Sequence, residues 1–193
     1  MMEDPILMDT FVDHEKQERP VTLRDGTRVR LRPIRPDDGA ALVALFGRLS
    51  ERTIYQRFFT VRRALPAEWV HLFTHVDYDR RMAIVAERDT ETGPEVMGVV
   101  RYDVTEPADT AEIAILVEDA WQGQGLGTIL LHDIMRAGEA RGVRTFRVDV
   151  LAENRAMLRL LARETEIVAR TTGQGLTEAL VRPRVTAPSS LRR

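Results

Sequence analysis

The fold is decided by Val117-Glu118-Asp119-Ala120-Trp121-Gln122-Gly123-Gln124-Gly125-Leu126-Gly127-Thr128. This segment begins as the end of an apolar run, passes through a short acidic turn and becomes a glycine-rich loop. An amphipathic pattern over residues 129–135 follows directly, so the order is strand, glycine loop, helix. The amino end of a helix presents backbone N–H groups and a positive dipole, and glycines let the backbone come close to an anion. The segment therefore predicts a site for a phosphate or pyrophosphate group.

The composition is that of an ordinary soluble globular protein. The chain has 193 residues, of which 44% are hydrophobic and 30% are charged, and this length suits one domain with a sizeable core. The formal net charge of −2 gives no indication of nucleic acid as a partner. The chain contains no cysteine, which excludes disulfides and thiolate metal sites.

The two ends of the chain lack the periodicity of folded elements. Residues 1–20 are polar and acidic, without the basic and apolar regions of a signal peptide, and we interpret them as a flexible arm. Residues 184–193 are expected to form a flexible tail, which leaves residues 21–183 as a single domain. No apolar run approaches the roughly 20 residues that a membrane span needs. These features predict a cytoplasmic protein without a membrane partner.

Hairpins are indicated at both ends of the domain. The first turns at Asp25-Gly26, a strong turn dipeptide. In its second arm Val29 and Leu31 alternate with arginines, which predicts a half-buried strand with Arg32 and the other arginines facing solvent. The last hairpin is predicted around Gly173-Gln174-Gly175.

Helices and further strands are indicated between these hairpins. Asp37 or Asp38 is positioned to cap a first helix, Ser50 a second, and a third helical segment surrounds Trp69. Further strands are indicated at 82–87, 96–104, 111–117 and 143–150, and further helices after the glycine loop and after Asn154. This order predicts an α/β (α+β) fold, a mixed sheet of about six to seven strands with helices on both faces.

Histidines and aromatic residues of the helical region could serve a binding site, but a structural role explains them as well. His71 and His75 have the spacing of metal ligands on a helix, but no third ligand accompanies them, so no metal site is predicted. The aromatic side chains of this region are expected to fill the core beneath the helices rather than to bind substrate. They are Tyr55, Phe58, Phe59 and Phe73.

The glycine loop does not fit two common nucleotide-binding motifs. In the dinucleotide fingerprint G-x-G-x-x-G, the third glycine position is occupied here by Thr128. The phosphate loop G-x-x-x-x-G-K-[ST] is absent, because Lys16 is the only lysine of the chain. The sequence therefore argues against nicotinamide binding and against nucleotide hydrolysis.

The loop resembles the acyl-CoA loop of the GNAT superfamily of N-acetyltransferases, whose pattern is [QR]-x-x-G-x-[GA]. Here the pattern is Gln122-Gly123-Gln124-Gly125-Leu126-Gly127, preceded by an aromatic Trp121. The resemblance covers residues 30–182, because the order of the predicted elements also agrees. It implies the GNAT fold and acetyl-CoA as the cosubstrate.

The same resemblance assigns residues to the cosubstrate. Backbone amides of the loop are implied to hold the CoA pyrophosphate, the preceding strand is implied to pair with the pantetheine, and a polar residue after the next strand is implied to contact CoA. In this chain these residues are Gln122, Gly123, Gln124, Gly125, Leu126, Gly127 and Thr128 of the loop, Ile115, Leu116 and Val117 of the strand, and Asn154.

A closer resemblance lies nearer the N-terminus. The segments at 30–38, 49–50, 57–59 and 77–79, which read RLRPIRPDD, LS, RFF and DYD, are similar to the GNAT domains of bacterial protein-lysine acetyltransferases. Such enzymes typically act on acyl-CoA synthetases and are often fused to regulatory domains. The resemblance implies a protein lysine as the leading acceptor. For the assembly we expect a monomer or a homodimer.

Glu112 is the predicted catalytic base. On an alternating strand it faces opposite to Ile113, Ile115 and Val117. An amine arrives as an ammonium ion and must lose a proton before it attacks a thioester, and a carboxylate can take that proton. A glutamate at this point of the strand has this role in the resembling protein acetyltransferases. The competing interpretation is an exposed strand glutamate.

Two departures from the family pattern leave alternatives open. Many GNAT enzymes have a tyrosine seven residues after the asparagine to protonate the leaving thiolate, but this chain has Leu161. The glycine-aromatic pair usual after that helix is replaced by Glu164-Thr165. Acetylation of a small amine, such as an amino acid, polyamine or antibiotic, therefore stays an alternative. A non-catalytic acyl-CoA-binding regulator is another.

Overall fold

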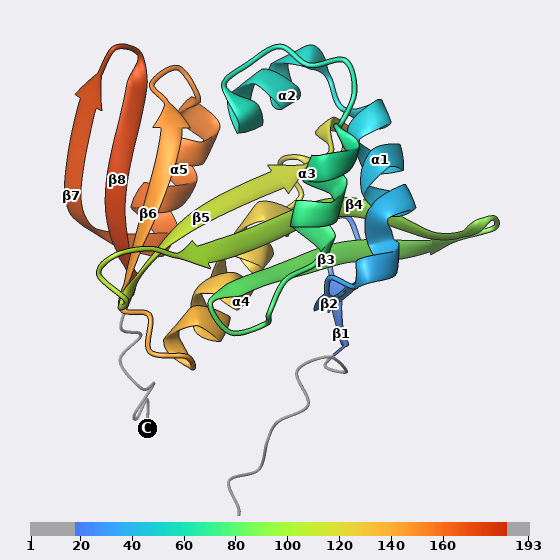
Figure 1. Ribbon diagram of the computed structural model, residues 1–193. Helices are drawn as coiled ribbons and strands as arrows, with labels where there is room; N and C mark the ends of the chain where they lie inside the picture. Colours follow the sequence, from blue (N-terminus) through green and yellow to red (C-terminus); the bar gives the residue numbers. More distant parts are fainter. Residues whose placement is uncertain (1–17, 185–193) are drawn as a thin grey trace, which may run out of the picture.

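The computed structural model describes residues 18–184. They form one eight-stranded sheet in the order β1-β2-β3-β4-β5-β6-β8-β7 (Figure 1). Neighbouring strands are antiparallel except β5 and β6, which are parallel. The strands are β1 (Arg19–Thr22), β2 (Arg28–Pro33), β3 (Arg81–Thr90), β4 (Gly93–Val104), β5 (Thr110–Val117), β6 (Thr145–Leu151), β7 (Thr165–Gly173) and β8 (Leu176–Pro183).

Helices cover both faces of this sheet, as Figure 1 shows. Helices α1, α2 and α3 lie on one face, and α4 packs against β3, β4 and β5 on the other. The mixed sheet with helices on both faces is confirmed, and its eight strands are close to the expected number. The helices are α1 (Gly39–Arg48), α2 (Glu51–Phe58), α3 (Ala67–Thr74), α4 (Leu126–Glu139) and α5 (Arg155–Glu164), with 3-10 turns at Pro36–Asp38 and Asp119–Trp121.

Alternating side chains of the central strands build two hydrophobic clusters. In β3, Ala83 and Val85 pack with Leu45 of α1 on one face. Met82 and Ile84 belong to the cluster on the opposite face, together with Ile134 of α4. Each central strand is therefore buried on both sides, and this holds its backbone in place beneath the helices.

The parallel strands β5 and β6 separate shortly after they meet. Their register pairs are Thr110↔Thr145, Ala111↔Phe146 and Glu112↔Arg147, and the pairing ends there. Figure 1 shows the two strands running apart beyond this point, with α2 above the opening. Within residues 18–184, the remaining part of β5 therefore has β4 as its neighbour on one side and no strand neighbour on the other.

The N-terminal end of the described chain differs from the expected flexible arm. Arg19 and Pro20, which we expected to belong to a flexible arm, pair with β2 in the first strand. The rest of the arm, residues 1–17, and residues 185–193 of the expected tail lie outside the described residues. Within residues 18–184, no helix combines the length and the apolar character needed to cross a lipid bilayer.

The prediction that Arg32 faces solvent is wrong. Its side chain is buried and donates hydrogen bonds to Asp38 (2.7 Å) and to Glu87 (2.7 and 3.0 Å). Arg30 donates to the same Glu87 carboxylate at 2.6 and 2.8 Å. Two carboxylates from outside this strand thus compensate a buried guanidinium, which an alternating pattern within one strand does not reveal.

Two further expectations on the helical region have mixed outcomes. Ser50 is the N-cap of α2, as predicted, and its hydroxyl accepts the backbone N–H of Thr53 at 3.1 Å. Phe58 and Phe73 pack against the core as expected. Tyr55 and Phe59 do not, because each is 41% exposed.

Candidate functional site

A cleft of about 380 Å³ lies where β5 and β6 separate. Its walls come from these two strands, from α2, from the glycine loop and the start of α4, and from α5. The splayed strands leave one backbone edge of β5 without a strand partner among the described residues. Such an edge offers hydrogen-bonding groups to an extended ligand that lies in the cleft.

The glycine loop forms one end of this cleft. Gly123 and Gly125 have φ values of +78° and +95°, a left-handed conformation that residues with a Cβ adopt at a cost. Gly125 is the N-cap of α4, so the loop ends directly on the first helical turn. The first amides of a helix have no acceptor within that helix. The loop therefore presents N–H groups that an anion in the cleft can accept.

The loop residues assigned by resemblance differ in where they lie. Five of them line the cleft, namely Gln122, Gly123, Gly125, Gly127 and Thr128. Leu126 does not, because its side chain is fully buried in the core under α4. Gln124 lies outside the lining as well, and its carbonyl accepts the backbone N–H of Arg24 at 3.2 Å. Any contact of these last two with a ligand would have to come from the backbone.

Gln122 also ties the loop to α2. Its Nε2 donates to Thr53 Oγ1 at 3.2 Å and to the carbonyl of Val117 at 3.0 Å. Asp119 strengthens this link, because its carboxylate accepts from the Ser50 hydroxyl at 2.7 Å and from Thr53 Oγ1 at 2.8 Å. Burial raises the pKa of Asp119, but the hydrogen bonds from Ser50 and Thr53 outweigh burial, and the net direction is down. The amino end of α2 and the loop thus form one connected unit.

The remaining residues assigned to the cosubstrate lie along the cleft. Ile115, Leu116 and Val117 line it from β5, and Asn154 lines it from the start of α5. Asn154 is the N-cap of α5, where its Oδ1 accepts the backbone N–H of Met157 at 3.1 Å.

Three arginines that sequence reasoning did not single out line the cleft. They are Arg24 of the β1–β2 hairpin and Arg159 and Arg163 of α5. A Cβ placed on Gly125 would lie 3.6 Å from Arg24 Nε, so this guanidinium is beside the loop. Arg163 donates to Thr128 Oγ1 at 3.1 Å. Guanidinium groups are suited to phosphate oxygens, and this cluster fits a ligand with several phosphates.

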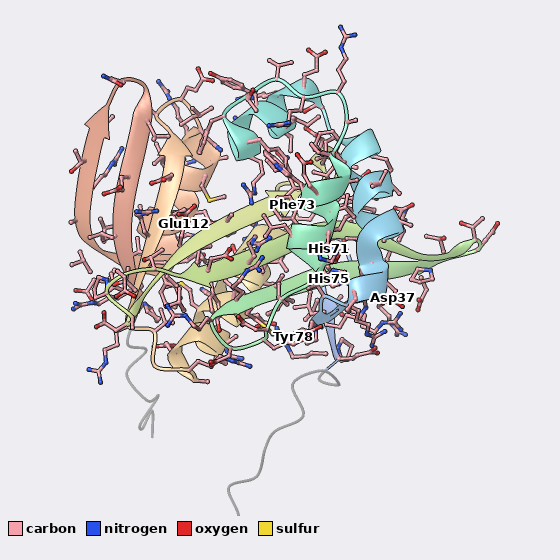
Figure 2. All side chains as sticks on the ribbon, in the orientation of Figure 1. Asp37, His71, Phe73, His75, Tyr78 and Glu112 are labelled. Carbon is pink, nitrogen blue, oxygen red and sulfur yellow. The ribbon has the colours of Figure 1, made fainter. Side chains whose placement is uncertain are left out.

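Glu112 lines the cleft at the point where the strands part (Figure 2). It lies opposite the face of Ile113, Ile115 and Val117, as predicted, because those three pack toward the α4 cluster. Its Oε2 accepts a hydrogen bond from Arg147 Nη2 at 2.5 Å, and its side chain is 44% exposed. The pKa of Arg147 is raised, chiefly by this hydrogen bond. The pair places the Glu112 carboxylate at the wall of the cleft.

Asp149 is a second carboxylate in the cleft, and sequence reasoning missed it. It follows Arg147 by two residues in β6, so both side chains lie on the same face of the sheet. One of its oxygens, Oδ1, is buried without a hydrogen-bond partner among the described residues. Burial raises the pKa of Asp149, and Arg147 acts in the opposite direction.

No tyrosine lines the cleft among residues 18–184. Leu161, at the position where many GNAT enzymes have one, is 1% exposed and belongs to the core. The hydroxyls of Tyr78 and Tyr102 donate to the backbone carbonyls of Ile34 and Asp79. The described cleft therefore contains no phenol that could serve as an acid.

Comparison with known proteins places the chain in a family. Residues 28–164 match the family model "Acetyltransferase (GNAT) domain". Acetyltransferase Pat of Mycolicibacterium smegmatis is 31% identical over 170 residues, which cover 88% of this chain and 50% of that protein. Acetyltransferase PA5475 of Pseudomonas aeruginosa is 31% identical over 137 residues, 70% of this chain and 73% of that protein. The chain thus spans half the length of the Mycolicibacterium relative.

Solved structures agree with the sequence comparisons. The GNAT domain of S. lividans PAT superposes with a TM-score of 0.76 at 37% identity, covering 84% of this chain and 95% of that one. A cAMP-binding acyltransferase from Mycobacterium smegmatis gives a TM-score of 0.59 at 27% identity, over 89% of this chain and 49% of that one. The fold, the glycine loop at the splayed strands and these relatives agree: the chain belongs to the GNAT family of acetyltransferases.

Proposed function

We propose that this acetyltransferase transfers the acetyl group of acetyl-CoA to the side-chain amine of a protein lysine. The observation that carries the proposal is the position of Glu112, at the last register pair before β5 and β6 separate. A carboxylate at that point adjoins both the free edge of β5 and the open side of the cleft beneath α2. It can therefore reach an amine that meets a thioester held along β5.

Acetyl-CoA fits the cleft by charge and by shape. The loop amides at Gly123 to Gly127 and the guanidinium of Arg24 would hold its phosphates. Ile115 and Val117 would border the pantetheine, whose amides can pair with the free edge of β5. Asn154 would contact the cosubstrate from α5. Together these groups would present the thioester carbonyl at the point where the strands part.

The chemistry at that point needs one proton acceptor and one fixed donor. Glu112 takes a proton from the acceptor ammonium, directly or through one water. The amine nitrogen then attacks the thioester carbonyl carbon, so that a C–N bond forms as the C–S bond breaks. A backbone N–H of β5 polarises the carbonyl oxygen. Because no tyrosine lines the described cleft, water would protonate the leaving CoA sulfur.

Protein lysine is the leading acceptor for two reasons. The relatives that match this chain include an acetyltransferase Pat and, among solved structures, the GNAT domain of a PAT. Phe59, at the end of α2, lines the cleft, and both Phe59 and Tyr55 of α2 have exposed aromatic side chains. Such side chains are typical of surfaces that contact other proteins.

The proposal is tested by product identification. Wild-type protein is incubated with acetyl-CoA and either a panel of lysine-bearing proteins, including an acyl-CoA synthetase, or a panel of free amines. Thiol release is recorded, and acetylated sites are located by mass spectrometry. Release that depends on a protein and ends in acetyl-lysine supports the proposal. Release with small amines alone would replace it with the small-molecule alternative.

A further inference from the structure

A second, smaller cavity adjoins the cleft. Its volume is about 30 Å³, and it lies between helices α1 to α3 and the face of β3 to β5 that they cover. It shares three lining residues with the cleft, namely Arg57, Ala114 and Leu116, so the two spaces meet at Arg57. Most of its wall is apolar, formed by side chains such as Leu42, Leu45, Phe46, Phe58 and Phe73.

Arg101 brings an unsatisfied donor into this apolar space. Its side chain is 10% exposed, and its Nε and Nη2 donate to Asp103 at 2.9 and 3.1 Å. Its guanidinium also lies over the ring of Phe73 of α3, 4.9 Å from the ring centroid (Figure 2). The third nitrogen, Nη1, is buried and has no hydrogen-bond partner among the described residues. A buried donor without an acceptor is costly, so this atom marks a place for an acceptor.

Arg57 adds a second guanidinium at the mouth of the cavity. It is half-buried, and its recorded contact is with the ring of Phe58 at 4.9 Å. Within residues 18–184 no carboxylate lies within ion-pair distance of it. Burial lowers the pKa of Arg57 to about 10, and the positive charge of Arg101 acts in the same direction.

The nearby carboxylates compensate Arg101 but leave Arg57 without a close partner among residues 18–184. Glu112 and Asp103 attract Arg57 at longer range, but each already has a closer partner. Glu112 pairs with Arg147, and Asp103 pairs with both Arg101 and Arg81. The cavity therefore carries an excess of positive charge within apolar walls, where an opposite charge is attracted more strongly than in water.

We infer that Arg57 and Arg101 bind a carboxylate carried by one of the two substrates of this enzyme. The source is either an acyl group that ends in a carboxylate or an amine acceptor that bears one, since donor and acceptor meet in the adjoining cleft. A carboxylate has three heavy atoms, and about 30 Å³ suffices for a group of that size by comparison with the space that bound waters need. The guanidinium fork matches carboxylate geometry. This inference rests on the proposed transfer reaction.

The donor source is tested by binding, without turnover. The dissociation constants of succinyl-CoA and butyryl-CoA are measured by calorimetry. Both acyl groups have four carbons, and one ends in a carboxylate where the other ends in a methyl group. If the acyl group supplies the carboxylate, wild-type protein binds succinyl-CoA about tenfold or more tightly than butyryl-CoA, and Arg57→Gln abolishes the difference.

The acceptor source is tested by turnover with acetyl-CoA. The kcat/KM values of Nα-acetyl-lysine and of its C-terminal amide are compared, because only the first bears a carboxylate. If the acceptor supplies the carboxylate, wild-type protein prefers the acid by about tenfold or more, and Arg57→Gln abolishes this preference. Arg52→Gln is the matched control, since Arg52 lies on the same helix, is exposed and lines neither cavity.

The result expected is a preference for the carboxylate form in one of the two arms, lost in Arg57→Gln and kept in Arg52→Gln. Arg57→Lys is a second variant for the case that Arg57→Gln folds poorly. Lysine keeps the positive charge but lacks the two-pronged guanidinium, so the preference for the carboxylate form should shrink. Equal values in both arms, or a preference that survives both Arg57 variants, would overturn the inference. Equal values beside normal acetylation of a lysine protein refute this inference alone, whereas the absence of all acetylation refutes the proposed function.

Discussion

Arg147 Nη2 donates a hydrogen bond to Glu112 Oε2 at 2.5 Å, across the last register pair of the parallel strands β5 and β6. Both side chains therefore stand where the sheet opens. The contact fixes the direction of the Glu112 carboxylate before any substrate arrives. It leaves the other carboxylate oxygen, Oε1, without a recorded partner among the described residues. Arg147 is in this view a positioning residue, and Glu112 is the group that takes the proton.

Arg147→Gln should lower kcat by roughly tenfold, because the Glu112 carboxylate is then less well oriented toward the amine. The KM for acetyl-CoA should stay unchanged, because neither Glu112 nor Arg147 is assigned to the binding of the cosubstrate. Arg147→Lys should recover part of kcat, since it restores a charged donor without the fork. Steady-state kinetics at varied acetyl-CoA provide the measurement. An equal rise in KM with constant kcat would argue against the positioning role.

Gly125→Ala should weaken acetyl-CoA binding. Gly125 has a φ of +95°, so a Cβ there costs about 1 kcal/mol or more through backbone strain, although its contact with Arg24 would be an ordinary one. Gly175→Ala is the control, because Gly175 has a φ of +78° in the β7–β8 turn and lies outside the cleft. Both variants should melt at lower temperature, but only the first should raise the Kd measured by calorimetry. Equal Kd values would show that the loop does not hold the cosubstrate.

Arg24→Gln should raise the Kd for acetyl-CoA about tenfold and make binding less sensitive to salt, because it removes one charge-assisted contact to phosphate. Arg28→Gln, a change to an exposed arginine of β2 outside the cleft, should have little effect. Calorimetric titrations at low and high salt test this. If both variants behaved alike, the phosphates would have to lie away from Arg24.

Asp149→Asn should stabilise the protein at neutral pH. Burial raises the pKa of Asp149 above its unfolded value, so the folded state disfavours the ionised carboxylate. Stability linked to this group is present below the unfolded pKa and is lost as pH rises through the folded pKa. The gain in melting temperature over wild type should therefore be present at about pH 7 and vanish toward about pH 4. Thermal unfolding over this range measures it, and a gain that grew toward acid pH would contradict the account.

Glu87→Gln should cost about 3 kcal/mol of the free energy of unfolding, because it removes a charge that compensates the buried Arg32. The Glu95→Gln control breaks a pair with Arg88 that is partly exposed, and it should cost less than about 1 kcal/mol. Urea denaturation followed by circular dichroism gives both values. Similar losses in the two variants would mean that the network around Arg32 contributes no more than a surface pair.

Local patterns of the sequence predicted most of the fold. The glycine loop, the cap at Ser50 and the two terminal hairpins depend on neighbouring residues, and each is found where the pattern indicated. The alternation in β5 also predicted the face on which Glu112 lies, because side-chain direction in a strand follows from position alone.

Long-range contacts could not be predicted in the same way. Arg24 meets the loop about a hundred residues further along the chain, through a hairpin whose placement depends on the whole sheet. Arg32 is buried because Asp38 and Glu87 converge on it. Arg57 and Arg101 come from a helix and a strand that only the packed fold brings together.

The central claim is that Glu112 is the base for amine acetylation in a cleft that binds acetyl-CoA. The most direct test compares thiol release by wild type and Glu112→Gln at saturating acetyl-CoA and acceptor, with Glu166→Gln, a change to an exposed residue of β7, as the control. The account predicts a fall in turnover of about 100-fold or more for Glu112→Gln, with the Kd for acetyl-CoA unchanged and normal turnover in the control. Wild-type turnover in Glu112→Gln would contradict it.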